Sequence, residues 1–309
     1  MISYEPLYET LKKRGITTYK LINEYGLSRS LLDRLRHNKP ISTVTINDLC
    51  TILSCDVSDV VKFTLNNNAP GNIYSIAGLN TQIEAEYPML KSRIAAYREK
   101  SAESIPPSIK VKVTNERIIK TVKHFDDRIT PEQSEYILAG GDFYRQLLSH
   151  NGIMLHSSAV VTNGKAYMFS APSGTGKSTH TALWLKMLED AYILNDDKPA
   201  IRVIGDKLFA FGTPFSGKHD ISRNTRVEIG GICFIKRSST NSIRMITAKE
   251  AIPLMLAQTM RFKEKSCMEN LLDVMDTVIR RVPVYELSCN TDISAAELSY
   301  RVMAKGLSK

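Results

Sequence analysis

The first 65 residues of the chain repeat one pattern: short stretches with leucines at helical spacing, separated by glycine, proline or polar breaks. Apolar positions three and four residues apart face one side of a helix, so the pattern predicts a small helical bundle. Ser28, Thr45 and Asp56 are expected to be helix N-caps, because each stands just before an apolar-periodic stretch. The predicted helices cover residues 4–14, 18–25, 28–37, 46–53 and 57–63.

After residue 72 the pattern changes to alternating or continuous apolar runs, which are typical of strands, between longer amphipathic stretches. This mixture predicts an α/β domain. Strands are expected at 73–76, 81–83, 110–114, 152–156, 158–161, 165–170, 191–194, 208–211, 227–235 and 282–287. Helices are expected at 131–150 with an interruption at Gly140-Gly141, around 183–188, and at 249–261, 269–281 and 295–304.

The two patterns meet at residues 66–71, where Pro70-Gly71 ends a polar run without apolar periodicity, which predicts a linker. The expected fold class is therefore α+β and multidomain: an N-terminal all-α bundle, then a mixed α/β domain. The expected domains are 1–65 for the bundle, 66–71 for the linker, 72–150 for a β-rich subregion with helices leading into the core, and 151–309 for that core.

Two of the predicted helices, 18–25 and 28–37, are joined by a turn at Gly26, an arrangement that predicts a helix-turn-helix. Residues 12–39 carry eight lysines and arginines against two acidic residues, a local charge of +6 in a chain of net charge +9. A basic second helix favours binding to double-stranded DNA. The alternative is a helical bundle whose basic residues form a solvated face or a protein contact.

The N-terminal stretch resembles the Cro/CI-repressor type of DNA-binding domain in residues 17–19, 25–30, 35–39 and 46–49. The resemblance implies that 28–37 is the recognition helix in the major groove and, since one such domain reads half a site, that the protein is a homodimer. Arg29 is expected to read guanine, whereas Thr18 and Lys39 are expected to hold phosphates. The full set of expected DNA contacts is Thr18, Arg29, Ser30, Asp33, Arg34 and Lys39.

Residues 171–179 read Ala-Pro-Ser-Gly-Thr-Gly-Lys-Ser-Thr and directly follow the predicted strand 165–170. The glycines let backbone N–H groups turn inward around a polyphosphate, Lys177 supplies a fixed positive charge, and Ser178 offers a hydroxyl to Mg²⁺. The segment therefore predicts a phosphate-binding loop for ATP and Mg²⁺. The expected nucleotide-binding residues are Ser173, Gly174, Thr175, Gly176, Lys177, Ser178 and Thr179.

Further candidate residues lie around this loop. Asp196 and Asp197 follow the carboxyl end of the predicted strand 191–194, and carboxylates at that end of a strand can hold Mg²⁺ and accept a proton from an attacking hydroxyl. His156 precedes the hairpin that leads to the loop. In segment 212–220, Ser216, Gly217 and Lys218 suit an anionic substrate. The alternatives are an ordinary Asp-Asp turn, a core histidine and an exposed loop.

Segments 155–158, 171–179, 195–197, 212–214 and 227–231 occur in the order of the HPr kinase/phosphorylase family, which is related to phosphoenolpyruvate carboxykinase. The resemblance implies a P-loop kinase domain that phosphorylates a serine hydroxyl, with Lys177 on the nucleotide. It also implies that one aspartate of the pair is the base and is hydrogen-bonded by His156. Asp196 is favoured as the base, and Asp197 with Ser178 as the metal ligands.

The chain departs from this family at two positions. Thr179 stands where the family has glutamate after the Lys-Ser pair, and Gly230 stands where the Glu-Ile-Arg-Gly signature has arginine. These departures argue against the reverse, phosphorylase reaction and against HPr as the partner.

The composition also indicates the class of protein and its cellular compartment. A hydrophobic content of 43% and a charged content of 24% are typical of a soluble globular protein. No membrane-length apolar run or signal peptide is present, and the five cysteines form no CxxC pair, so a cytoplasmic protein without membrane partner or zinc is expected. The sequence thus predicts a serine kinase, acting on free serine, a peptide or a protein, fused to a DNA-binding head. The alternative is a nucleotide-responsive transcriptional repressor with negligible turnover.

Overall fold

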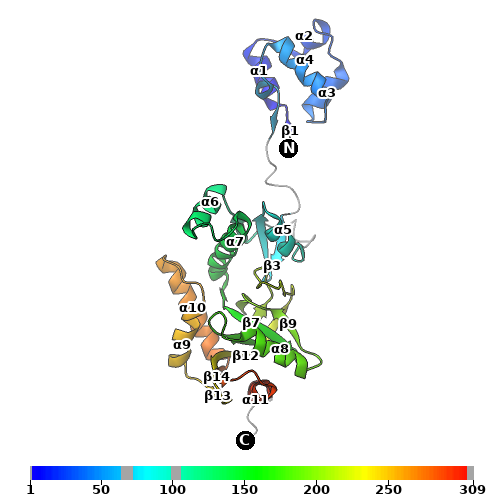
Figure 1. Ribbon diagram of the computed structural model, residues 1–309. Coiled ribbons are helices and arrows are strands. Elements are labelled where there is room, and N and C mark those ends of the chain that lie inside the picture. The colour runs from blue at the N-terminus through cyan, green and yellow to red at the C-terminus, as the bar shows by residue number, and fades with distance from the viewer. Residues whose placement is uncertain (1, 64–71, 99–105, 305–309) are drawn as a thin grey trace. The chain divides into compact units, whose positions relative to one another are not determined.

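The computed structural model of the chain describes residues 2–63, 72–98 and 106–304. The chain divides into two compact units, Met1–Ala69 and Pro70–Lys309 (Figure 1). The predicted linker, 66–71, lies outside the described residues. The first unit is helical and the second mixes helices with sheets, so the predicted fold class, an all-α domain followed by a mixed α/β domain, is confirmed.

Four α-helices form most of the described part of the N-terminal unit. They are α1 (Glu5–Lys13), α2 (Thr18–Asn23), α3 (Arg29–Arg36) and α4 (Thr43–Leu53). Ser28 caps α3 as predicted, because its side chain accepts a hydrogen bond from the N–H of Leu31 at 3.1 Å. The cap of α4 is Ser42 rather than Thr45: its hydroxyl accepts from the Thr45 N–H at 3.1 Å and starts the helix before the apolar periodicity begins.

The predicted fifth helix, 57–63, is wrong. A 3-10 helix covers Val57–Asp59, and the chain then extends into β2 (Lys62–Phe63), which pairs with β1 (Ile2–Ser3). Pairing with the start of the chain therefore overrides the helical spacing of the apolar residues. The leucines that carried the helical pattern do meet in one core, in which Leu7, Leu21, Leu35 and Leu49 are fully buried.

A nine-stranded sheet organises the C-terminal unit, in the order β6-β10-β11-β12-β8-β7-β9, with β14 beside the second half of β12 and β13 outside it. Strands β10 and β13 were not predicted, and each is five residues or shorter. The strands are β6 (Gly152–Met154), β7 (Ser157–Thr162), β8 (Lys165–Ser170), β9 (Tyr192–Asn195), β10 (Ala200–Ile204), β11 (Lys207–Phe211), β12 (Arg226–Arg237), β13 (Ser242–Met245) and β14 (Val284–Cys289).

Helices cover both faces of this sheet. Side chains alternate between the faces along a strand, so Ala159 and Val161 of β7 join one core and Val160 joins the other. The first core contains side chains of α9 (Ala248–Ala257) and α10 (Lys265–Arg281). The second contains side chains of α8 (Lys177–Met187) and α11 (Ile293–Met303).

Residues 72–150 are mixed rather than β-rich. Three strands, β3 (Ile73–Ile76), β4 (Leu79–Glu84) and β5 (Ile109–Lys112), form a small sheet. Three helices accompany it: α5 (Pro88–Ala95), α6 (Asn115–His124) and α7 (Pro131–Leu147), of which α5 and α6 were not predicted. Side chains of α5 and α7 share a core with Phe211 and Phe215, so this region belongs to the same compact unit as the large sheet.

The expected break of the helix at Gly140-Gly141 is wrong, because α7 runs unbroken through both glycines. Packing explains at least one of them. A Cβ atom at position 140 would lie 3.0 Å from the ring of Phe215, so the missing side chain lets α7 approach that ring. Here glycine marks a close contact and not a helix end.

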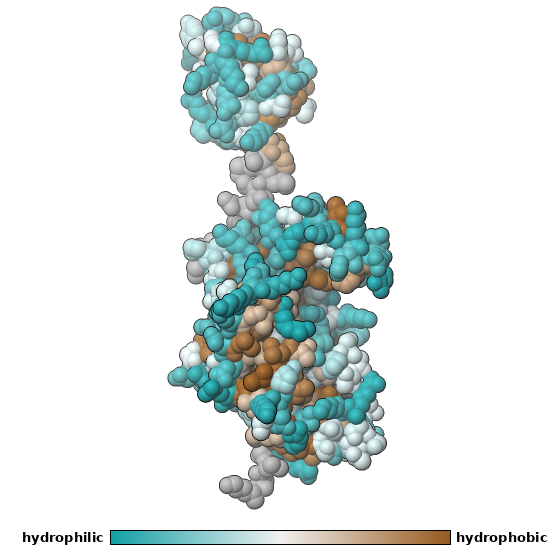
Figure 2. All heavy atoms as spheres, turned by 90° about the vertical axis from the view of Figure 1, so that its left-hand side faces the viewer, coloured by the Kyte–Doolittle hydropathy of each residue, from teal (hydrophilic) through white to brown (hydrophobic). Residues whose placement is uncertain are grey.

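In the described part of the chain, no helix combines the length and apolar character needed to cross a bilayer. Figure 2 shows hydrophobic residues gathered on one face of the C-terminal unit. Among the exposed apolar side chains of this unit are Ile252 of α9 and Leu272 of α10.

A matched pair of glycine substitutions tests the close packing around glycines in the C-terminal unit. At Gly212 a Cβ atom would lie 1.9 Å from the backbone oxygen of Arg223, so we expect Gly212→Ala to destabilise the C-terminal unit by about 1–3 kcal/mol or more. At Gly141 the nearest atom is 3.6 Å away, so Gly141→Ala should be neutral or stabilising by about 0.5–1 kcal/mol. Fluorescence of Trp184, the single tryptophan of the chain, reports denaturation of this unit. Equal stability of the two variants would contradict the prediction.

Candidate functional site

The pairing of β7 with both of its neighbours gathers the predicted site at one edge of the large sheet. β7 runs antiparallel to β8 and to β9, with Ser157 opposite Ser170 and Ala159 opposite Asn195. The carboxyl ends of β8 and β9 therefore lie beside the start of β7. The glycine-rich loop and the acidic pair leave these two ends, and His156 stands just before the start of β7.

The loop between β8 and α8 is shaped by two glycines with positive φ. Gly174 and Gly176 have φ values of 77° and 123°, which only glycine adopts without strain. Lys177 is the first residue of α8, and its Nζ donates to the backbone oxygen of Ala171 at 2.9 Å. Burial lowers the pKa of Lys177, while attraction to Asp197 opposes this shift. The loop thus combines a helix N-terminus with one largely buried ammonium group.

Arg237, at the end of β12, holds the same loop from outside. Its guanidinium donates to the backbone oxygen of Thr175 at 3.1 Å and also to that of Gly174. Sequence reasoning missed this residue, because its position follows from the parallel pairing of β12 with β8 and not from any local motif.

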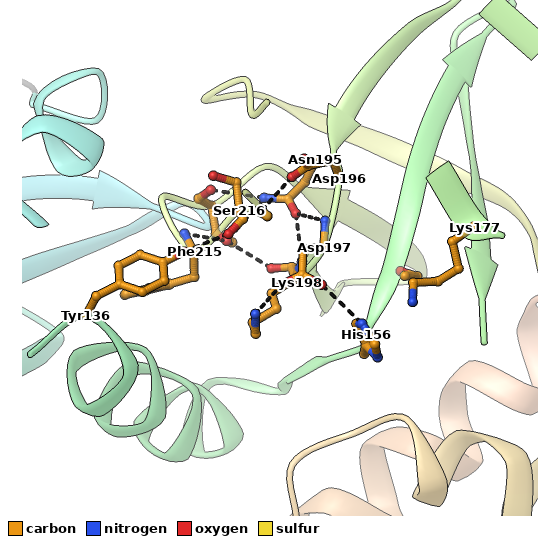
Figure 3. A network of polar contacts seen from close by, with 12 residues as sticks. Tyr136, His156, Lys177, Asn195, Asp196, Asp197, Lys198, Phe215 and Ser216 are labelled. Carbon is orange, nitrogen blue, oxygen red and sulfur yellow. Dashed lines mark hydrogen bonds and ion pairs between the residues drawn. The ribbon is translucent and has the colours of Figure 1, made fainter. Parts of the chain in front are cut away.

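Asp197 forms an ionic cluster at the end of β9. One carboxylate oxygen lies 3.1 Å from His156 Nε2, and the other contacts the ammonium group of Lys198 (Figure 3). Burial alone would raise the pKa of Asp197, but the hydrogen bond from His156 and the charge of Lys198 outweigh it and lower this pKa to about 2. Asp197 is therefore a firmly ionised carboxylate. Lys198 was missed as a site residue although it adjoins the predicted pair.

Asp196 has the opposite electrostatic character. Its Oδ1 accepts a hydrogen bond from the N–H of Gly217 at 2.6 Å. Burial raises the pKa of Asp196 and the neighbouring charge of Asp197 adds to the shift, while the Gly217 hydrogen bond partly offsets it. The resemblance placed His156 on the aspartate that acts as base, and Asp196 was favoured for that role. The structure instead places His156 on Asp197. The contact with His156 and the favoured choice of Asp196 as base therefore point to different aspartates.

His156 is fixed on its other side as well. Its Nδ1 lies 3.0 Å from the side-chain oxygen of Gln258, and its backbone N–H donates to the Gln258 carbonyl oxygen at 2.8 Å. Because a carboxylate only accepts hydrogen bonds, Nε2 must carry the proton that faces Asp197. Gln258 lies after α9, a distance along the chain that hid it from sequence reasoning.

One cavity of about 430 Å³ collects most of the predicted site residues. Two predicted residues do not line it: Thr175 and Ser216 each face a different cavity nearby. His219, which was not predicted as a site residue, does line it. The residues around the cavity are His156, Ser173, Gly174, Gly176, Lys177, Ser178, Thr179, Asp196, Asp197, Gly217, Lys218 and His219.

Within the described residues, no three His, Cys, Asp or Glu side chains are grouped to hold a metal ion. Mg²⁺ at nucleotide sites needs fewer protein ligands, since one or two carboxylates act together with phosphate oxygens and water. Ser178 and the ionised Asp197 line the same cavity, so the residues present fit that coordination.

The N-terminal unit presents a second candidate site on α3. Arg29, Ser30 and Arg34 are exposed, while Leu35 of the same helix is buried in the core. Lys39 is exposed and Thr18 is half-buried at the start of α2. Asp33 is also exposed, but its carboxylate lies 3.1 Å from His37 and 3.6 Å from Lys39, so part of its hydrogen-bonding capacity is used inside the unit.

Comparisons with known proteins agree with part of this picture. The family model of the Cro/C1-type HTH DNA-binding domain matches residues 7–65, which confirms the predicted class of the N-terminal domain and supports a DNA-binding regulator. No curated protein sequence matches the chain.

Among solved structures, the Hpr(Ser) kinase/phosphatase from Coxiella burnetii is similar to the chain with 10% identity and a TM-score of 0.28. The match covers 49% of this chain and 97% of that one. A likeness at this level decides nothing about activity, and the fold of the C-terminal unit rests on the sheet order described above.

The ionic cluster at Asp197 predicts a specific pH dependence of stability. Since the pKa of this carboxylate is lowered from 3.8 to about 2 on folding, its pairing stabilises the protein above pH 4 and is lost as the pH falls towards 2. We expect Asp197→Asn to lower the free energy of unfolding at pH 7, because the stabilising ion pair is lost. The expected loss is about 1–2 kcal/mol, since the pair is partly exposed and solvent screens it. The difference from wild type should shrink between pH 4 and pH 2.

Denaturant titrations followed by Trp184 fluorescence measure this difference. Asp206→Asn, at an exposed position between β10 and β11, is the matched control and should show no such pH-dependent loss. A deficit of Asp197→Asn that persists undiminished at pH 2 would rule out the ion pair as its source.

Proposed function

We propose that the C-terminal unit is an ATP- and Mg²⁺-dependent phosphotransferase whose acceptor is a hydroxyl group such as that of serine. We also propose that the N-terminal domain makes the protein a DNA-binding transcriptional regulator. One observation carries the first part: the phosphate loop and both aspartates line a single cavity. Phosphoryl transfer needs mainly positioning and charge stabilisation, and these residue types supply both.

The loop residues would bind the donor. The backbone N–H groups of 173–179 and the N-terminus of α8 would hold the β- and γ-phosphates of ATP, with the Lys177 ammonium neutralising charge that builds up during transfer. A cavity of about 430 Å³ at this loop has room for a triphosphate tail and the acceptor group.

The two aspartates would divide the remaining work by their electrostatics. Asp196, whose pKa is raised, is the better proton acceptor for the attacking hydroxyl. Asp197 stays anionic and is oriented by His156, which suits a ligand of Mg²⁺ together with Ser178. When bound, Mg²⁺ would neutralise charge on the transferring phosphoryl group.

On the DNA side, the exposed face of α3 would enter the major groove. Arg29 and Arg34 carry charge-assisted donors for base edges or phosphates, and Lys39 would contact the backbone. A single domain reads half a site, so we propose that a homodimer binds the operator.

Substitutions in the C-terminal unit test the transferase. Lys177→Ala should lose both ATP affinity and transfer. Asp196→Asn should lower the rate of transfer by about 10²–10⁴-fold while ATP affinity stays within a few-fold, because only proton acceptance is removed. For the wild type, the rate should fall on the acid side as the raised pKa of Asp196 is crossed, since the base must be ionised.

Transfer from labelled ATP to serine, to serine peptides and to soluble cell extract measures these rates. The control variant is Asp206→Asn, an exposed aspartate outside the cavity. Wild-type protein that binds ATP yet phosphorylates none of these acceptors would refute the transferase. The nucleotide would then be an effector of DNA binding.

The DNA-binding face is tested with a preferred operator selected from random duplexes by the full chain. Arg29→Ala should weaken operator binding by about 1–3 kcal/mol and relax the base preference at one position. Lys39→Ala should weaken binding to all sequences and make the slope of log affinity against log salt concentration shallower by about one. Lys13→Ala, which removes one charge from the end of α1, is the control. If all three variants lose the same affinity with unchanged base preference, α3 does not read the operator.

A further inference from the structure

A second cavity adjoins the one at the phosphate loop. It also has a volume of about 430 Å³, and the two share Asp197, Gly217 and Lys218 as lining residues. No loop residue between 171 and 179 lines the second cavity. Figure 3 shows Asp197 and Lys198 between Lys177 on one side and Tyr136 on the other. Asp197 therefore lies at the boundary between the two cavities, and Asp196 lines only the first of them.

The wall between the cavities is locked to the helices of residues 72–150. Arg93 of α5 donates to the carbonyl oxygen of Ser216 at 3.0 Å and to that of Gly217 at 3.1 Å. The hydroxyl of Tyr136, on α7, donates to the Ser216 carbonyl oxygen at 2.8 Å, and the Arg93 guanidinium stacks 4.6 Å from the Tyr136 ring. The turn that carries Lys218 is thus held from the side opposite to the phosphate loop.

The two helices that hold this turn are themselves fixed. The N-terminus of α5 has no side-chain cap of its own. Carboxylates of α7 take that role instead: Glu135 accepts from the N–H groups of Glu86 and Tyr87 at 2.6 and 3.0 Å, and Glu132 accepts from that of Met89 at 2.5 Å. Anions at a helix N-terminus are favourable, so these carboxylates stabilise the start of α5 beside the second cavity.

The lining of the second cavity is cationic and partly apolar. Lys198 and Lys218 present ammonium groups, against Asp197 as the single acidic residue of the lining. Lys218 is exposed and forms no ion pair with any described residue. The side-chain nitrogen of Gln133 is a further donor, because toward the described residues this side chain uses only its oxygen, which accepts from the Thr130 N–H. Met89, Ile129 and Ile137 complete the wall.

We propose that this second cavity is the acceptor subsite and that the acceptor is a small hydroxylated carboxylate, such as a three-carbon hydroxy or hydroxyamino acid. The inference rests on the proposed phosphotransferase. The carboxylate would face Lys198, Lys218 and Gln133, and the hydroxyl would face Asp197 at the boundary and reach Asp196 in the first cavity. The volume suits a small molecule and the excess of donors selects an anion.

The step balances with ATP as co-substrate. The acceptor oxygen forms a bond to the γ-phosphorus as the bond from that phosphorus to the β–γ bridging oxygen breaks. ADP leaves with that electron pair, and the hydroxyl proton passes to the Asp196 carboxylate and then to water. The products are a phosphoester of the hydroxy acid and ADP.

A panel of acceptors tests the carboxylate requirement. Labelled ATP is offered with L-serine, D-glycerate, ethanolamine, which has the hydroxyl but no carboxylate, and a serine peptide with blocked ends. We expect transfer to the two hydroxy acids alone. Lys218→Met should raise the KM for the acceptor about tenfold or more, since one charge-assisted contact is lost. Lys249→Met, at an exposed position of α9, is the matched control.

Calorimetric titration of L-serine and D-glycerate into the full chain, with a non-hydrolysable ATP analogue present, gives a readout that does not need turnover. Binding that Lys218→Met weakens and Lys249→Met does not supports the subsite even if no transfer is seen, in which case only the transferase fails. Transfer to the blocked peptide without binding of either hydroxy acid overturns the subsite and leaves the transferase standing. Absence of both binding and transfer for the hydroxy acids also overturns the subsite.

Discussion

The antiparallel pairing of β7 with two neighbours at once is the constraint on which the candidate site depends. A strand that lies antiparallel to both β8 and β9 makes those two parallel to each other, so their carboxyl ends open at the same edge. The phosphate loop and the acidic pair follow from these two ends. His156, placed just before β7, falls between them, and its contact with Asp197 is a direct result of this register.

Environment makes two adjacent aspartates chemically different. Asp197 has a histidine and a lysine as partners and remains ionised to low pH, whereas for Asp196 burial outweighs the hydrogen bond from the Gly217 N–H and raises the pKa. Carboxylates whose pKa values are driven apart divide into a proton acceptor and a permanent anion. Both residues are aspartates, so only their different contacts assign the roles that we propose.

Residues 72–150 contribute to the site although they carry none of the motifs. Arg93 and Tyr136 hold the turn at Ser216 and Gly217. The backbone N–H of Gly217 then donates a hydrogen bond to the Asp196 carboxylate. A shared core with Phe215 keeps the small sheet and its helices on the large sheet. This region therefore bounds the second cavity on the side away from the glycine-rich loop.

The sequence by itself determined the features that depend on neighbours along the chain. Glycine spacing specified the tight loop before α8, leucine periodicity specified the helical bundle, and a serine cap specified the start of α3. Tertiary structure alone decided the features that join distant segments: the partner of His156, the arginine that braces the loop, the unbroken helix at Gly140, and the strand that replaced a helix at Phe63. Local propensity acts over a few residues, whereas these contacts are selected by packing and pairing across the fold, which no local pattern encodes.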